Sequence, residues 1–146
     1  MEELSPEKEW ISLLLRLAVA SLFIGAVIPK FQGGLGNVVQ SFQTLFQNSW
    51  LPMPLVKLHA RLTPWIELLI PIWLLVGIRL RWAWILTGLF LVSLSFGMVV
   101  AGQGAVAATN YSYLLLACAG LYFSPFDRYS VDGMRGAACC GGGSCH

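Results

Sequence analysis

Four long apolar stretches, separated by short polar connections, dominate the pattern of the chain. They cover residues 10–29, 55–77, 82–101 and 105–123. Each approaches the roughly 20 apolar residues that an α-helix needs to cross the hydrocarbon core of a bilayer. The segment 82–126 contains no Asp, Glu, Lys or Arg, whereas a core helix of a water-soluble protein would show a polar face within that length. The pattern predicts an all-α fold, an integral membrane four-helix bundle in contact with the lipid bilayer.

The segment between the first two stretches has a different pattern. Residues 32–54 are rich in Gly, Gln and Asn, yet their apolar residues recur at helical spacing. We expect a short amphipathic helix in the membrane interface between spans one and two, and the alternative is a loop with some apolar side chains. The apolar residues at helical spacing are Val38, Val39, Phe42, Leu45 and Phe46.

The whole chain divides into a four-span membrane domain, 1–132, and a flexible Gly- and Cys-rich tail, 133–146.

Composition agrees with the hydrophobic pattern. The chain is 57% hydrophobic and 11% charged, whereas a soluble domain has about 25% charged residues. Its net charge of +2 is too small to indicate a nucleic-acid partner. The first nine residues hold four Glu against one Lys and lack the basic start of a cleaved signal, so we expect the first apolar stretch to remain as a span.

The basic residues predict an orientation. With four spans, the two termini and the turn at 79–81 share one side of the membrane, and that side holds more Lys and Arg than the other. The positive-inside rule then places both termini in the cytoplasm of a multi-pass protein of the cell inner membrane. Tryptophans near the predicted span ends suggest an aromatic belt. These are Trp10, Trp50, Trp65, Trp82 and Trp84.

Polar residues inside the spans are the first candidate site. Glu67 lies near the middle of the second span, where a carboxylate normally faces the bundle interior or a wet cavity. Pro64 and Pro71 remove helical N–H donors on both sides of it. Glu67 could therefore belong to a proton, ion or quinone site, or to a structural ion pair. Arg16 could reach Glu67 or extend to the interface, and Asn110 is expected to hydrogen-bond to a neighbouring helix.

A basic cluster at the outer end of the second span is the second candidate. His59 and Arg61 lie there, with Lys57 and Lys30 expected nearby. Such residues could bind an anionic head group or a small oxyanion, or they could only anchor the helix at the interface. Small residues repeat every four positions on the first and third spans, which lets helix backbones approach closely. We therefore expect close packing within the bundle, or contact with a protein partner or with a second copy of the chain in a homo-oligomer.

The tail is the third candidate. Cys139, Cys140, Cys145 and His146 fall within eight residues, and the glycines between them let the chain fold back on itself. Thiolates favour soft ions, so the tail could bind Cu(I) or Zn(II), although the spacing is not a standard zinc pattern. The alternative is a passive tail. Cys118, inside the fourth span, is expected to be a small packing residue.

Several short motifs in this order resemble those of a known family. The first span reads LLLRL at 13–17 and closes on Pro29-Lys30; the second carries ELL at 67–69 and LLVG at 74–77; later come FGM at 96–98, Asn110-Tyr111 and YSVD at 129–132. Over about residues 10–132 the chain resembles the DoxX family of small four-helix membrane proteins. The resemblance implies a redox context, because relatives include the small membrane subunit of thiosulfate:quinone oxidoreductase. It also implies that Arg16, Glu67 and Asn110 are the polar positions within the membrane.

Two functional hypotheses follow. The first is an accessory or anchoring subunit of a membrane redox system, quinone- or thiol-linked, with quinone as a possible cofactor. The second is a soft-metal or thiol-handling membrane protein that uses its tail. A subunit that only packs is a third option. An independent enzyme is not expected, because the sequence shows neither a Gly-rich nucleotide loop nor a set of nucleophile, base and oxyanion donors.

Overall fold

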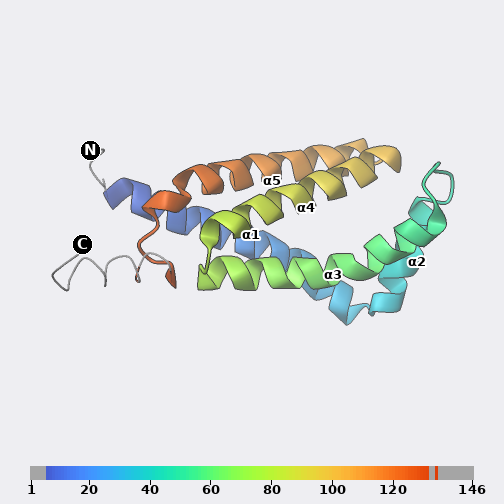
Figure 1. Ribbon diagram of the computed structural model, residues 1–146. Helices are drawn as coiled ribbons and strands as arrows, with labels where there is room; N and C mark the ends of the chain where they lie inside the picture. The colour runs from blue at the N-terminus through green and yellow to red at the C-terminus, as the bar shows by residue number, and fades with distance from the viewer. Residues whose placement is uncertain (1–5, 132–133, 135–146) are drawn as a thin grey trace.

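The structure is a computed structural model that describes residues 6–131 and 134, and this part of the chain is almost entirely helical (Figure 1). Four helices are long and apolar enough to cross a membrane, and a shorter one lies between the first two of them. The all-α fold class and the four spans are therefore confirmed. The elements are α1 (Pro6–Gln32), α2 (Leu35–Leu45), α3 (Met53–Val76), α4 (Leu80–Val100), α5 (Gly104–Phe123) and the short 3₁₀ helix η1 (Ser124–Phe126).

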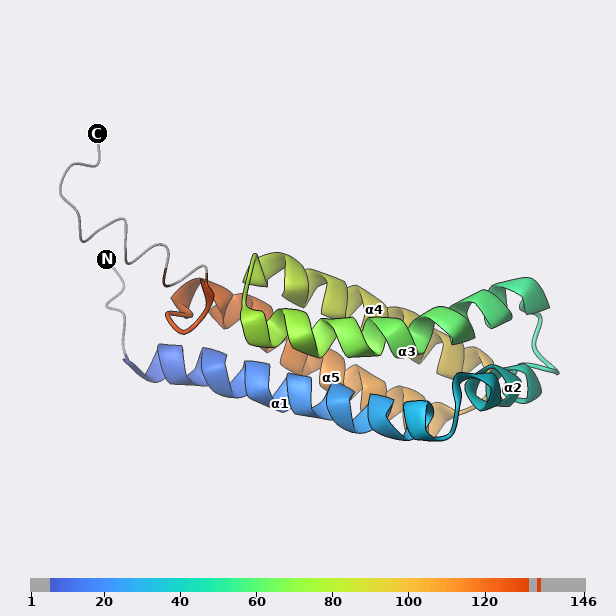
Figure 2. The ribbon, with the colours of Figure 1, turned by 90° about the horizontal axis from the view of Figure 1, so that it is seen from below.

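The four long helices form two antiparallel pairs. Helices α1 and α3 pack along each other, as do α4 and α5, and α1 also contacts α5 (Figure 2). The beginning of α1 and the 3₁₀ helix η1 lie at one end of the bundle. Helix α2 lies across the opposite end and packs mainly on α3 (Figure 1). The segment after span one is thus helical, as its spacing predicts, and we refer to the two ends of the bundle as the η1 end and the α2 end.

Gly77 ends α3, and both its backbone and its surroundings require glycine. Its φ of 72° lies in the left-handed region, which favours a residue without a Cβ. A Cβ built there would stand 2.7 Å from the Cβ of Ser130 and 2.9 Å from Nη2 of Arg16. The chain that follows η1 therefore packs directly on the α3–α4 turn.

Trp84 is buried in the core between α4 and α5, so its prediction as an interfacial belt residue is wrong. Its side chain is 1% exposed, whereas Trp82 is 58% exposed. Residues two apart on a helix point to nearly opposite sides, so the two rings cannot both face lipid. The Trp84 ring lies against Gly120, where a Cβ would come within 2.4 Å of it. The absence of a side chain at Gly120 is therefore what lets α5 approach α4 so closely.

Cys118 also differs from its prediction. It is a free cysteine on the exposed surface of α5 and does not fill space inside the bundle. In the spanning region this surface faces lipid, where a small apolar thiol is tolerated without packing.

Candidate functional site

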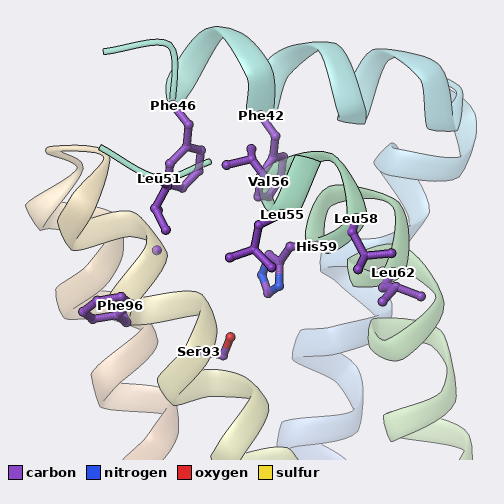
Figure 3. Close-up of a pocket in the computed structure, with 11 residues that line it drawn as sticks. Phe42, Phe46, Leu51, Leu55, Val56, Leu58, His59, Leu62, Ser93 and Phe96 are labelled. Carbon is purple, nitrogen blue, oxygen red and sulfur yellow. The ribbon is translucent and has the colours of Figure 1, made fainter. Parts of the chain in front are cut away.

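An apolar groove of about 310 Å³ lies near the α2 end, between α2, α3 and α4 (Figure 3). Two aromatic rings of the α2 region form one wall, with the Phe42 and Phe46 centroids 6.1 Å apart. Leucines of α3 and residues of α4 form the other walls, so the groove is predominantly apolar. Its lining consists of Phe42, Phe46, Leu51, Leu55, Val56, Leu58, His59, Leu62, Ser93, Phe96 and Gly97.

Two polar side chains line this groove: His59 contributes an imidazole and Ser93 a hydroxyl group. The imidazole of His59 lies between α3 and α4, with Ser93 across from it on α4 (Figure 3). Its ring is 6.4 Å from that of Phe42, centroid to centroid, and is half-buried. The backbone carbonyl of His59 accepts a 2.8 Å hydrogen bond from Oγ1 of Thr63, but no described residue hydrogen-bonds to the imidazole nitrogens. Within the described part of the chain, both nitrogens are therefore available to bind a molecule in the groove.

The rim of the groove is exposed on the surface that faces lipid. Leu55, Leu58 and Phe96 each line the groove and are more than half exposed. An amphiphile could thus place a head group against His59 while its chain lies along the outside of the bundle. Arg61, predicted to act with His59, is exposed and does not line the groove, so the structure does not unite the predicted basic cluster in one site.

Glu67 forms an ion pair with Lys30 at the end of α1. The carboxylate is almost completely buried, whereas the side chain of Lys30 is about one-quarter exposed. Lys30 was expected near His59 and Arg61, but its ammonium reaches into the bundle. A buried carboxylate needs such a partner, because an isolated charge in a low-dielectric interior is strongly disfavoured.

Glu67 and Asn110 line one small cavity of about 60 Å³ between the four long helices. Tyr113 also lines it, and the remaining walls are apolar. Nδ2 of Asn110 is buried and has no hydrogen-bond partner among the described residues, so the expected interhelical hydrogen bond is not formed. The cavity has room for a few water molecules but is far smaller than the roughly 300–1,000 Å³ of typical small-molecule sites. A quinone ring therefore does not fit beside Glu67.

Arg16 does not contact Glu67; it joins a separate network near the η1 end. Its Nη1 lies 3.0 Å from Oδ2 of Asp127, and both side chains are buried. Nε and Nη2 donate to the carbonyls of Leu74 and Leu75 at 2.8 and 2.7 Å. Ser12 donates to the same Asp127 oxygen at 3.0 Å.

This network closes the end of α3. The last carbonyls of a helix lack intrahelical donors, and a cation there also interacts favourably with the helix dipole. The Arg16 guanidinium supplies both the donors and the charge, while Asp127 balances that charge. Arg16 therefore holds α1, α3 and the segment after η1 together.

The sequence alone did not reveal two of these partners. Asp127 lies beyond the last apolar stretch and is 111 positions from Arg16, so no local spacing connects them. Lys30 looked like a residue that ends the first span, yet its long side chain can reach back to Glu67. The only hint was balance of charge, because each buried charge within the spans requires a partner of opposite sign.

The predicted metal ligands Cys139, Cys140, Cys145 and His146 lie outside the described residues. Within residues 6–131 and 134, no group of three or more His, Cys, Asp or Glu side chains is placed to hold a metal ion. The soft-metal hypothesis for the tail stays a prediction.

Comparison with known proteins adds one finding. A model of the DoxX family matches residues 11–101, which is more than half of the chain. This chain belongs to the DoxX family. No curated protein and no solved structure matched. The matched region of this DoxX protein contains the groove and the Lys30–Glu67 pair, whereas Asn110 and Asp127 follow it in the sequence.

Proposed function

We propose that this DoxX protein is an accessory membrane subunit of a quinone-linked redox system, and that the groove between α2, α3 and α4 receives the quinone head group. The observation that carries the proposal is an apolar, partly aromatic groove of about 310 Å³ with His59 and Ser93 as its converging polar groups. Small-molecule sites are built in this way, with apolar walls and a few polar groups that orient the ligand.

The chemistry of a quinone matches this lining. A quinone ring is flat and apolar apart from its carbonyl oxygens, which accept hydrogen bonds. The imidazole N–H of His59 and the hydroxyl of Ser93 are donors, and the rings of Phe42 and Phe46 offer apolar surface to the head group. The lipid-facing rim leaves room for an isoprenoid tail along the bundle. When bound, the quinone would supply the redox chemistry, while the residues of this chain bind and orient it.

The position of the groove supports the same proposal. It lies beside α2, which crosses the end of the bundle where head groups of lipids and quinones meet water. The η1 end carries Arg79, Arg81 and Arg128, and by the positive-inside rule we assign that end to the cytoplasm of the cell membrane. The groove would then open on the opposite side of the membrane, and a redox partner would be anchored by the bundle.

The test is a binding titration with the full-length chain in lipid nanodiscs. Decylubiquinone should bind saturably, and His59→Phe should weaken binding about tenfold, since one hydrogen bond contributes about 1–1.5 kcal/mol. Arg61→Gln is the matched control, because Arg61 lies two residues away on α3 but outside the groove; it should leave the affinity unchanged.

Two results would contradict the proposal. One is equal affinity of the wild type and His59→Phe. The other is equal affinity for decylbenzene, which has the same chain but no quinone oxygens, because that result would assign the groove to acyl chains.

A further inference from the structure

Lys30 lies between two cavities near the α2 end. The outer cavity has a volume of about 310 Å³ and is lined by Lys30 together with residues of the α1–α2 connection and α2, among them the polar Asn37 and Ser41. The inner cavity is the one lined by Glu67 and Asn110. Because the Lys30 ammonium binds Glu67, polar groups follow one another from the outer cavity to the middle of the bundle.

We propose that Glu67 is a proton-exchange site within the membrane, reached through the outer cavity, and that Lys30 is a counter-ion that a proton can replace. The Glu67 carboxylate is 2% exposed, so its negative charge must be balanced by one positive charge. Either of two groups can supply this positive charge: the ammonium of Lys30, or a proton bound to the carboxylate itself.

The position of Lys30 allows its ammonium to move away from the Glu67 carboxylate. It is in the last turn of α1, its side chain is 26% exposed, and Gly33 and Gly34 follow it. Long cationic side chains near helix ends can extend outward to the interface. In the exchange, a hydronium ion in the outer cavity gives up one proton, which forms an O–H bond with the Glu67 carboxylate, and a neutral water molecule is left behind. The ammonium keeps its own protons and moves into the outer cavity, so one proton is bound and one positive charge moves outward.

Asn110 is an independent indication that the inner cavity holds a ligand. Its Nδ2 is a buried donor without a partner among the described residues, and it lines the same cavity as Glu67. Water in this cavity would accept from Asn110 and hydrogen-bond to Glu67. Such buried polar sites usually hold ordered water.

The surroundings favour a proton over a metal cation. Hard cations take about six or more oxygen ligands, whereas the side-chain oxygens lining the inner cavity come only from Glu67, Asn110 and Tyr113 among the described residues. Among the described residues, the other titratable groups near Glu67 are Lys30 of α1, which pairs with it, and the Tyr113 phenol of α5, which lines the same cavity. Helix α4 contributes only leucines, and the residues of α2 at the outer cavity are not titratable. The inference does not depend on the quinone groove.

The test is infrared spectroscopy of the full-length chain in lipid nanodiscs across a pH series. The wild type should show a carboxylic-acid C=O band that grows on acidification and is missing from Glu67→Gln. In Lys30→Met the band should already be present at neutral pH, and in Lys30→Arg it should behave as in the wild type. No Glu67-dependent band at any pH at which the helices persist, or no band at neutral pH in Lys30→Met, would overturn the proposal.

A second measurement tests the route. With the four native cysteines replaced by Ser, a bulky thiol adduct on Asn37→Cys should slow hydrogen–deuterium exchange of the Glu67 acid severalfold. The same adduct on Thr109→Cys is the control, because Thr109 is exposed and lines neither cavity. Equal exchange rates in both labelled variants would overturn the proposed route.

Discussion

Replacing Arg16 with Met should destabilise the bundle strongly, although the new side chain is apolar and the site lies in a membrane helix. The substitution keeps a similar length but removes four hydrogen bonds of 2.7 to 3.2 Å. It leaves the Asp127 carboxylate buried, with Ser12 as its remaining side-chain donor among the described residues. It also leaves the carbonyls of Leu74 and Leu75 without their donors.

The magnitude follows from the burial of both partners. The side chains of Arg16 and Asp127 are 3% and 0% exposed, so solvent screens the pair very little. Removing one member of a buried ion pair typically costs about 3–5 kcal/mol, because the other charge stays uncompensated. Arg16→Met should therefore lower the free energy of unfolding by about that amount, while Arg81→Met, at an exposed arginine, should change it by less than about 0.5 kcal/mol.

The assay is unfolding by SDS in mixed micelles, followed by far-UV circular dichroism. The double variant Arg16→Met/Asp127→Leu has no unpaired charge, so its destabilisation should be smaller than the sum of the single variants by about 2 kcal/mol. If Arg16→Met lost no more stability than Arg81→Met, or if the two single effects simply added, the reasoning about the buried pair would be refuted.

Three further predictions follow from the packing, the tail and the orientation. Gly120→Ala should cost about 1–3 kcal/mol in the same unfolding assay because its Cβ would meet the Trp84 ring at 2.4 Å, whereas Gly88→Ala, whose nearest neighbour is 3.5 Å away, should be nearly neutral. If the tail binds soft metal, purified chain should bind Cu(I) or Zn(II) stoichiometrically, and binding unchanged by Ser at Cys139, Cys140 and Cys145 would exclude that role. A cysteine placed in the α2–α3 connection of a chain without its native cysteines should react with impermeant reagent from outside intact cells; reaction only after lysis would reverse the assigned orientation.

The helices could be predicted from the sequence because the hydrocarbon core imposes one simple requirement, a long apolar stretch without unpaired charge. The amphipathic helix α2 was also predictable, since its apolar residues recur at helical spacing within a polar segment. Trp84 shows the limit of that reasoning. Proximity to a span end suggested an interfacial ring, but its place two residues after Trp82 puts it on the inner face.

The candidate site was less predictable, because it depends on contacts between distant segments. Glu67, Asn110 and His59 were identified as polar residues in or near the spans, yet the sequence did not show that the first two share a cavity while His59 lines a separate groove. Arg16 belonged to the same predicted set, but its network lies elsewhere in the bundle. Which charges pair depends on helix register and packing, and these are decided by the whole bundle.

The most direct test of the central proposal, a quinone site in the groove, is photo-crosslinking with an azido-quinone in native-like membranes, followed by mass spectrometry of the labelled peptides. If the quinone binds in the groove, labels should fall in the α2 region, in the first half of α3 and around Ser93–Gly97 of α4. An excess of decylubiquinone should reduce this labelling. Labels confined to the outer face of α5, or labels that an excess of decylubiquinone does not reduce, would contradict a quinone site in this groove.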